Sequence, residues 1–326
     1  MDKKFIVITT IVNPTEAVKN FSELENYELI VVADKRTPSN WELENGHYVS
    51  IAEQNKNKLP ITKELPYNHY LREMIGYLYA ITYGADIIID TDDDNIPKLG
   101  WGFPEFNGYF ESTNEEENFF NVYKIFSDQK IWPRGFPLNK INNNDLLNRK
   151  FEKKLNSIGV WQGLADVDPD VDAIYRLINN EPCYFNDRNP IVLNTGTICP
   201  FNSQNTAIRK ELFPLLYLPA FVNFRFTDIL RGLVAQPIMW LYGYKVGFTK
   251  ATVIQKRNEH NYLTDFESEI PVYLLSEKIV ELVRDKVDYR LTITENLLRA
   301  YEELFHHSIV DGRELKLLKL WLKEFN

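Results

Sequence analysis

Apolar runs alternate with helix-type patterns over the N-terminal part of the chain. Runs of β-branched residues at 5–12, 29–33 and 87–89 have the composition of strands that are buried on both faces. Residues 69–83 carry apolar side chains at helical spacing, and Gly84 follows where a left-handed helix cap belongs. Strands that alternate with helices predict an α/β fold, doubly wound around a mostly parallel sheet.

The pattern changes in the rest of the chain. Residues 101–205 are rich in Asn, Pro, Gly and aromatic residues, which predicts loops and short strands. A helix at 227–242 and a strand at 246–254 follow, and residues 272–326 are strongly helical. We therefore expect an α/β sheet domain with a helical C-terminal extension.

Composition and charge narrow the classes of protein. The 326 residues are 44% hydrophobic, enough for a sizeable core, which excludes a mostly disordered chain. The formal net charge of -9 argues against nucleic-acid binding, which needs a basic surface. Two cysteines, Cys183 and Cys199, are too few for a disulfide framework or a cysteine-rich zinc site. No apolar run approaches the roughly 20 residues that span a bilayer, so we expect a cytoplasmic protein.

A cluster of carboxylates directly follows the strand predicted at 87–89. Asp90, Asp92, Asp93 and Asp94 lie at its carboxyl end, where open α/β sheets bind their ligands. Such carboxylates repel one another unless a cation neutralises them. Mg²⁺ or Mn²⁺ prefers oxygen ligands and usually keeps substrate phosphates in its shell. The pattern predicts a metal that bridges two aspartates and a diphosphate; an acidic turn that caps a helix is the alternative.

The strand and its Asp-x-Asp sequence resemble the nucleotide-sugar glycosyltransferases of the GT-A fold, a Rossmann-like fold. Asp92 and Asp94 match the two ends of that motif, whose metal anchors the donor diphosphate in the family. The resemblance implies a nucleoside-diphosphate sugar as donor, Mn²⁺ or Mg²⁺ as cofactor, and a glycan or lipid-linked acceptor, as in polysaccharide biosynthesis.

Three further segments resemble the DUF288/STELLO-type proteins and the reversibly glycosylated polypeptides, which are UDP-arabinopyranose mutases. Residues 72–95 resemble the segment through the aspartate motif, 132–138 an Arg-Gly-Tyr-Pro element, and 228–240 a later Asp-x-x-x-Gly helix. The order agrees over about residues 5–265 and implies a UDP-sugar. The mutases carry a reversibly glycosylated arginine just after their element, whereas residues 138–140 here read Leu-Asn-Lys. This departure favours transfer to a separate acceptor.

The resemblance also suggests a division of the chain. Residues 1–265 would form the GT-A domain, with a nucleotide-binding half at 1–100 and an acceptor-side half at 101–265. Residues 266–326 would form a helical region outside the clear match. Packing on the main domain, formation of a homo-oligomer and contact with a membrane-associated partner are the alternatives for these helices, the last of which would make the protein peripheral at a membrane.

Several residues at strand ends are expected to bind the donor. Thr9 and Thr10 end the first strand and Asp34 ends the second, so all three meet at the ligand edge of the sheet. Arg36 is a candidate partner for a phosphate, and Arg72 for the diphosphate or the aspartates. The alternatives are a plain strand end for the threonines and an exposed helix arginine for Arg72.

Three further residues complete the expected donor and metal site. Asp93 lies between the two motif aspartates and is assigned to donor binding. Gly196 would let the backbone approach the donor sugar, or it would form a tight turn. His260 would complete the metal shell beside the motif, as a late histidine does in many GT-A enzymes.

Two residues are assigned to catalysis. Asp228 would remove the proton of the acceptor hydroxyl as the sugar bond forms, or it would cap a helix. Arg134 matches the first arginine of the Arg-Gly-Tyr-Pro element. The predicted function is a metal-dependent glycosyltransferase; the alternatives are a UDP-sugar mutase or autoglycosylating protein and a non-catalytic scaffold with a GT-A fold.

Overall fold

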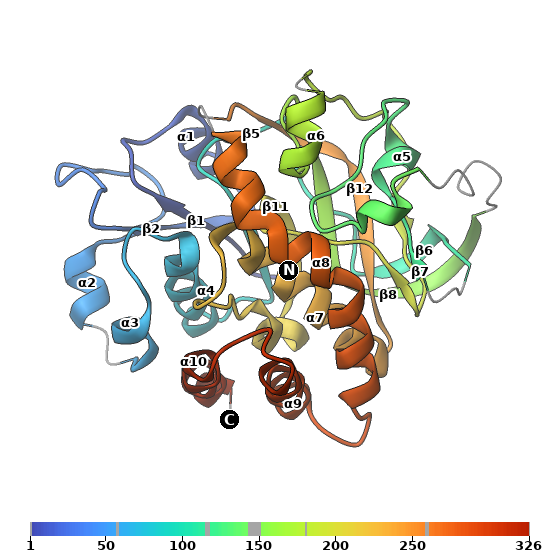
Figure 1. Cartoon of the computed structure of the whole chain (residues 1–326). Helices are drawn as coiled ribbons and strands as arrows, with labels where there is room; N and C mark the ends of the chain where they lie inside the picture. The colour runs from blue at the N-terminus through green and yellow to red at the C-terminus, as the bar shows by residue number, and fades with distance from the viewer. Residues whose placement is uncertain are drawn as a thin grey trace.

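The computed structural model of the chain describes residues 2–56, 59–114, 118–142, 151–179, 181–257 and 261–325. Within these residues, one sheet of ten strands has the order β3-β2-β1-β4-β11-β8-β6-β9-β12-β5 (Figure 1). Its strands are β1 (Lys4–Thr10), β2 (Glu28–Ala33), β3 (His47–Val49), β4 (Ile87–Thr91), β5 (Asn95–Pro97), β6 (Asn107–Ser112), β8 (Glu152–Asp166), β9 (Ile191–Val192), β11 (Asn205–Arg209) and β12 (Tyr244–Gln255). A second sheet pairs β7 (Asn118–Phe119) with β10 (Thr197–Ile198).

The N-terminal strands form the parallel part of the large sheet. β1 pairs in parallel with β2 on one side and with β4 on the other, and β3 continues the parallel order beyond β2. β11 is antiparallel to β4, and the sheet is mixed from there on. The predicted α/β fold with a large sheet and C-terminal helices is therefore confirmed. The carboxyl ends of β1, β2 and β4 meet at one edge, as parallel pairing requires.

Helices cover both faces of this sheet. The α-helices are α1 (Glu16–Ser22), α2 (Ile51–Lys56), α3 (Ile61–Glu64), α4 (Glu73–Thr82), α5 (Tyr123–Phe126), α6 (Ala173–Ile178), α7 (Thr227–Leu241), α8 (Tyr262–Lys286), α9 (Ile293–His306) and α10 (Gly312–Leu322). Short 3₁₀ turns are η1 (Tyr70–Arg72), η2 (Leu138–Lys140), η3 (Lys210–Leu216), η4 (Phe224–Phe226) and η5 (Lys323–Phe325). Because strand side chains alternate between faces, Ile6 and Ile8 pack with Phe21 of α1, whereas Phe5 and Val7 belong to the core under α4 and α7.

Gly76→Ala is expected to destabilise the protein, because α4 approaches the sheet most closely at this glycine. A Cβ at Gly76 would lie 2.4 Å from Cγ1 of Val7 and 2.8 Å from Cγ2 of Val32, so α4 would have to move outward. Overpacking of this kind costs about 1–3 kcal/mol, which urea unfolding measures. In the control Gly312→Ala, the nearest atom to the new Cβ belongs to Phe305 at 3.7 Å, and stability should be unchanged or higher. A stable Gly76→Ala would contradict this packing.

The middle of the chain departs from the prediction of short strands. β8 is 15 residues long and pairs with β6, β11 and β12 inside the large sheet. Gly159 and Gly163 weaken the strand signal of its sequence, but neighbouring side chains occupy the space that a Cβ would need. A Cβ would lie 2.3 Å from Leu212 at the first glycine and 2.4 Å from Asn205 at the second. The prediction of short strands only was wrong because these glycines fit packing partners far away in the sequence.

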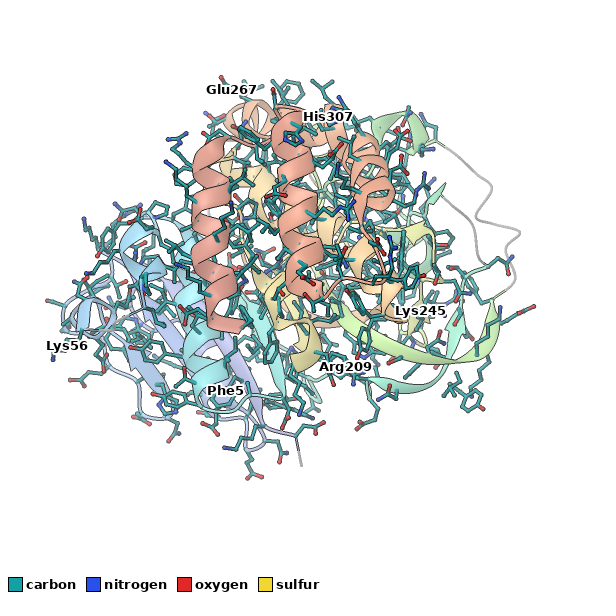
Figure 2. The ribbon with its side chains drawn as sticks, turned by 90° about the horizontal axis from the view of Figure 1, so that it is seen from below. Phe5, Lys56, Arg209, Lys245, Glu267 and His307 are labelled. Atoms are coloured by element: carbon teal, nitrogen blue, oxygen red, sulfur yellow. The ribbon has the colours of Figure 1, made fainter. Side chains whose placement is uncertain are left out.

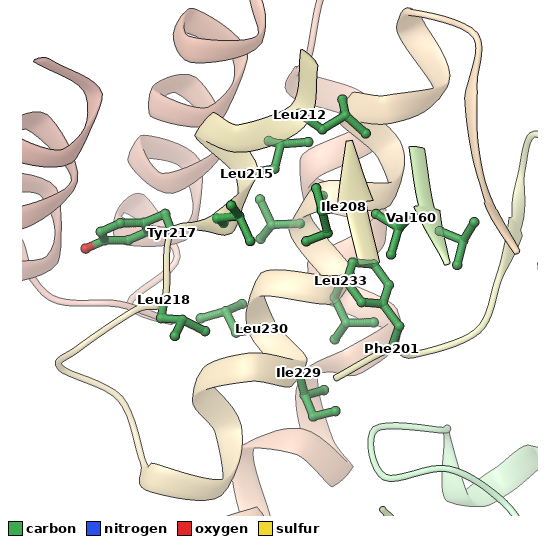
Figure 3. Close-up of a cluster of buried hydrophobic side chains, with 14 of the residues drawn as sticks. Val160, Phe201, Ile208, Leu212, Leu215, Tyr217, Leu218, Ile229, Leu230 and Leu233 are labelled. Carbon is green, nitrogen blue, oxygen red and sulfur yellow. The ribbon is translucent and has the colours of Figure 1, made fainter. Parts of the chain in front are cut away.

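The C-terminal helices pack on the same face as α7. α8 and α9 both contact α7, and α10 lies against α9 (Figures 1 and 2). Leu230 and Leu233 of α7 join Ile208 of β11 and Leu215 of η3 in one buried cluster (Figure 3). Trp321 of α10 is fully buried and its indole N–H donates to Pro214 O at 2.8 Å. The helices thus complete the core under the sheet, and the domain boundary at residue 265 stays a prediction.

Among the helices formed by the described residues, none has both the length and the apolar character that a membrane span requires.

Candidate active site

Two adjoining cavities open at the carboxyl ends of the parallel strands. The larger has a volume of about 430 Å³ and the smaller about 190 Å³. Five residues line both: Tyr70, Asp92, Phe224, Gln255 and Arg257. The larger cavity is completed by Thr9, Thr10, Ile11, Asp34, Arg36, Asn68, His69, Asp93 and Asp94, and the smaller by Arg134, Asp170, Ser203, Gln204, Arg225 and Asp228.

The larger cavity brings together most of the residues that were predicted to bind a donor. The Thr10 hydroxyl donates to Oδ2 of Asp93 at 2.5 Å, which ties the end of β1 to the turn after β4. Asp34 follows β2, and its Oδ2 accepts the backbone N–H of His69 at 3.0 Å. Arg36 lies exposed at the rim. The strand ends therefore form one wall of this cavity, as the parallel topology predicted.

The aspartates after β4 carry more negative charge than the described residues around them neutralise. Burial raises the pKa of Asp92 well above its usual range, and repulsion from Asp94, Asp90, Asp93 and Asp228 adds to the shift. Burial, followed by repulsion from Asp93, raises the pKa of Asp94 to about 6. A cation would relieve both effects.

These carboxylates fit a hard divalent cation. No described residue donates a hydrogen bond to the carboxylate of Asp92, so its oxygens are available to a metal. Among the described residues, the side-chain amide of Gln255 donates to Asp94, at 3.2 Å to Oδ1 and 3.4 Å to Oδ2. Oxygen ligands of this kind suit Mg²⁺ or Mn²⁺. Within the described residues, no three His, Cys, Asp or Glu side chains form a ready metal cage, and His260 lies outside the described residues.

A buried layer of charged side chains lies beneath the aspartate turn, and sequence patterns hardly indicate it. Arg231 of α7 donates to Oδ2 of Asp90 at 2.9 Å, and both side chains are almost completely buried. Glu73 of α4 accepts hydrogen bonds from Thr9 at 3.0 Å and from Tyr77 at 3.3 Å. Burial, followed by repulsion from nearby aspartates, raises the pKa of Glu73 well above its usual range. The only sequence feature that indicated this layer was the position of Glu73, directly before the apolar stripe of its helix.

The two predicted catalytic residues form an ion pair in the wall of the smaller cavity. Arg134 donates to both oxygens of Asp228, at 3.0 and 2.8 Å, and to both oxygens of Asp170 at 2.8 Å. Asp228 lies in the first turn of α7, but the cap position is Phe226 and no side chain caps the helix. The helix-cap alternative for Asp228 is therefore wrong. Its carboxylate instead faces the cavity with a guanidinium behind it.

Two predicted donor-binding residues lie elsewhere. Arg72 is fully buried, and its guanidinium donates to Gln54 Oε1 at 2.8 Å and to Leu65 O at 3.2 Å, so it does not reach the aspartates. The non-local partner Gln54 takes the side chain away from the site. Gly196 has a φ of +86° in a tight turn closed by Thr197 N to Asn194 O at 3.0 Å. Gly196 lines a different cavity, so the tight-turn alternative holds.

The sequence interpretation missed several lining residues. Arg225 and Arg257 supply positive charge to the smaller cavity, and Tyr70 and Phe224 stand between the two cavities. Arg225 follows Phe224 in η4, immediately before α7, and Arg257 follows the end of β12. Of these residues, only Arg257 could have been predicted to line the site, because it is a basic residue just beyond the end of a strand.

The chain is similar to proteins that are described as glycosyltransferases of the STELLO type. Residues 225–326 match the family model described as STELLO glycosyltransferases. Probable glycosyltransferase STELLO2 of Arabidopsis thaliana is 30% identical over 273 residues, which cover 77% of this chain and 35% of that protein. Probable glycosyltransferase STELLO1 of the same plant is 25% identical over 346 residues, which cover 99% of this chain and 44% of the relative. The chain thus spans less than half the length of these curated relatives.

These matches confirm the resemblance to the STELLO-type proteins, whereas the resemblance to the reversibly glycosylated polypeptides stays a prediction.

Proposed function

We propose, for a chain that is of the STELLO glycosyltransferase type, a metal-dependent transfer of sugar from a nucleoside-diphosphate sugar to a hydroxyl of a glycan or other acceptor. UDP-sugars are the donors we favour. The observation that carries the proposal is Asp92, an uncompensated carboxylate that lines two adjoining cavities at the ligand edge of an α/β sheet. A site with two compartments and one shared charged wall suits a reaction between two substrates.

The larger cavity is assigned to the donor. Its strand-end residues Thr10 and Asp34 offer a hydroxyl and a carboxylate to the nucleoside, and Asp34 is held in place by the His69 backbone. Asp92 and Asp94 would hold the divalent cation, which supplies positive charge to the diphosphate when bound. The protein groups of this cavity would thereby bind the nucleoside of the donor and hold the cation for its diphosphate.

The smaller cavity is assigned to the acceptor. Asp228 and the side chains of Ser203 and Gln204 line it, so it offers several groups that can accept or donate hydrogen bonds to sugar hydroxyls. Arg134 fixes the orientation of Asp228 by a two-point ion pair. Because both oxygens of Asp228 accept from a guanidinium, the carboxylate is better suited to orienting the acceptor hydroxyl than to removing its proton as a strong base.

Release of UDP from a panel of UDP-sugars tests this function. We expect Mn²⁺-dependent UDP release from at least one UDP-sugar, stimulated by a glycan acceptor, and we expect Asp92→Asn to lose it. The matched control Asp187→Asn removes an exposed carboxylate that pairs with Lys250 and should keep full activity. Isomerisation of the donor without an acceptor would favour the mutase, and absence of any turnover or nucleotide binding would favour the scaffold.

Asp94→Asn is expected to stabilise the metal-free protein by an amount that depends on pH. The pKa of Asp94 is raised to about 6 in the folded protein, whereas an unfolded chain has a value of about 3.9. Between these two values the folded protein holds a proton that the unfolded chain has released, so stability falls as the pH rises. Asp94→Asn has no carboxyl group to ionise at this position, so it does not lose this stability. Its gain in melting temperature should be absent near pH 4 and grow up to about pH 6. Above this pH the gain should grow further where Asp92 ionises, because the variant also lacks the repulsion that adds to burial in raising the pKa of Asp92.

Thermal unfolding in EDTA across this pH range measures the difference between the two proteins. The difference is informative because His69, whose pKa burial lowers to about 4, titrates in both proteins and cancels. Saturating Mn²⁺ should reverse the order, since only the wild type gains the full binding energy of the metal. Two results would contradict the assignment of Asp94 to the metal site. One is a difference in melting temperature that is the same at every pH, and the other is a variant that still melts above the wild type in saturating Mn²⁺.

A further inference from the structure

Four arginines with nearly buried side chains lie around the aspartate turn, and three of them donate hydrogen bonds to carboxylates. Arg134, Arg225 and Arg231 each donate to a buried carboxylate oxygen at 2.8 or 2.9 Å. These pairs are Arg134–Asp170, Arg225–Glu269 and Arg231–Asp90. Their guanidinium groups are thus committed to partners within the protein. The fourth, Arg257, differs.

Arg257 has a buried guanidinium without a hydrogen-bond partner among the described residues. Its side chain is only 10% exposed, and Nη1 is buried and makes no hydrogen bond to the part of the chain that the structure describes. Its carboxylate neighbour, Asp168, lies 3.8 Å away, beyond hydrogen-bond distance, and also pairs with Arg176. Burial, followed by repulsion from Arg225, lowers the pKa of Arg257. A buried cation in this state is costly unless an anion joins it.

The strand pairing places Arg257 beside the motif aspartates. β12 pairs with β5 through Gln255 opposite Asn95, and the backbone N–H of Lys256 donates to Asp94 O at 3.2 Å. Arg257 follows directly and lines both cavities, as does Asp92. The site therefore offers carboxylates for a metal and, in the same shared wall, a guanidinium that makes no hydrogen bond to the described residues. A diphosphate, which binds metals and arginines together, matches this arrangement.

We propose that Arg257 binds the diphosphate of the donor, through hydrogen bonds from its guanidinium to phosphate oxygens. This inference rests on the proposed function, since it names the phosphate subsite of the same donor cavity. It reassigns a role that the sequence suggested for Arg72, whose guanidinium is held by Gln54 and Leu65. A planar guanidinium donates two parallel hydrogen bonds to a phosphate, which an ammonium group does not reproduce.

Calorimetric titration of UDP and of uridine in saturating Mn²⁺ tests the phosphate subsite. We expect Arg257→Gln to weaken UDP binding by roughly 10- to 100-fold, because charge-assisted hydrogen bonds are lost. Binding of uridine, which has no phosphate, should be unchanged, and Arg257→Lys should recover only part of the loss. The matched control Lys256→Gln removes a neighbouring exposed positive charge that pairs with Glu16, and should bind UDP within about twofold of the wild type.

Three outcomes separate this inference from the proposed function. UDP binding by Arg257→Gln at wild-type affinity overturns the inference and leaves the proposed function standing. Binding of Mn²⁺-diphosphate that depends on Arg257, without binding of UDP, supports the phosphate subsite and overturns the uridine donor. A wild type that binds neither ligand overturns both.

A stability measurement excludes a merely structural role for Arg257. Because its buried guanidinium makes no hydrogen bond to the described residues and its one ion pair there, with Asp168, is long at 3.8 Å, Arg257→Gln should melt at or above the wild-type temperature when no ligand is present. A large drop in the melting temperature of Arg257→Gln would mean that the arginine holds the fold, and would overturn the assignment.

Discussion

Asp92→Asn is expected to abolish sugar transfer and at the same time to stabilise the unliganded protein. The carboxylate lines both cavities and has no hydrogen-bond donor among the described residues, while burial and four neighbouring aspartates oppose its charge. The folded protein therefore holds a carboxyl group whose ionisation is unfavourable without a ligand, which is typical of functional sites. Removal of the charge relieves the repulsion and removes a metal ligand in one step.

The expected loss in kcat/KM for Asp92→Asn is at least about 100-fold, the range seen when a charge-stabilising group of a site is removed. UDP release measures the activity, and thermal unfolding in EDTA measures the stability. Asp187→Asn serves as the control in both assays, because its carboxylate is 81% exposed. A variant that loses activity and also melts earlier would indicate a structural aspartate. One that retains activity would place the metal site elsewhere.

Arg134→Met is expected to give the largest loss of stability among the site variants. Its guanidinium neutralises Asp170 and Asp228, and all three side chains are at most 7% exposed. Removal of one partner of a buried ion pair leaves an uncompensated charge, which typically costs about 3–5 kcal/mol. The double variant Arg134→Met/Asp228→Asn should recover part of this cost, because one of the two orphaned charges is then removed as well.

Urea unfolding of the single and double variants measures the coupling between the two residues. Arg290→Met is the matched control: Arg290 pairs with Asp288 but is 73% exposed, and the pair should contribute less than about 1 kcal/mol. If Arg134→Met cost no more than Arg290→Met, or if the double variant were no more stable than the single, the buried ion pair would not support the cavity wall. Arg134 would then be free for a direct catalytic role.

Local patterns were sufficient to predict the sheet edge at which the site lies. β1, β2 and β4 are short, apolar and β-branched, so a buried parallel sheet was the only economical interpretation of their sequences. The carboxyl ends of parallel strands meet by geometry. Thr10, Asp34 and Asp92 could therefore be assigned to one cavity without knowledge of any long-range contact.

Side-chain directions at the site could not be predicted, because partners distant in the sequence decide them. Arg72 precedes an apolar helix stripe and was expected near the phosphates, but Gln54 captures its guanidinium in the core. Arg134 and Asp228 were both assigned to catalysis, yet they form an ion pair with each other across 94 residues. Such pairs follow from the tertiary packing and leave no periodic signal in the sequence.

Dependence on partners that are distant in the sequence also explains why the long strand β8 was not predicted. β8 contains glycines and polar residues that argue against a long buried strand when it is considered alone. Its glycines are required by the side chains of Leu212 and Asn205, which occupy the space above them. Sequence patterns therefore predict elements well where burial is uniform, and poorly where a strand is shaped by particular neighbours.

Donor binding at Asp92 is tested most directly by calorimetric titration of UDP into the wild type, with Mn²⁺ and with EDTA, and into Asp92→Asn with Mn²⁺. The predicted result is saturable binding to the wild type in Mn²⁺ only, lost in EDTA and in the variant. No binding of UDP to the wild type in Mn²⁺, or equal binding by the variant, would contradict a metal-dependent nucleotide site at Asp92.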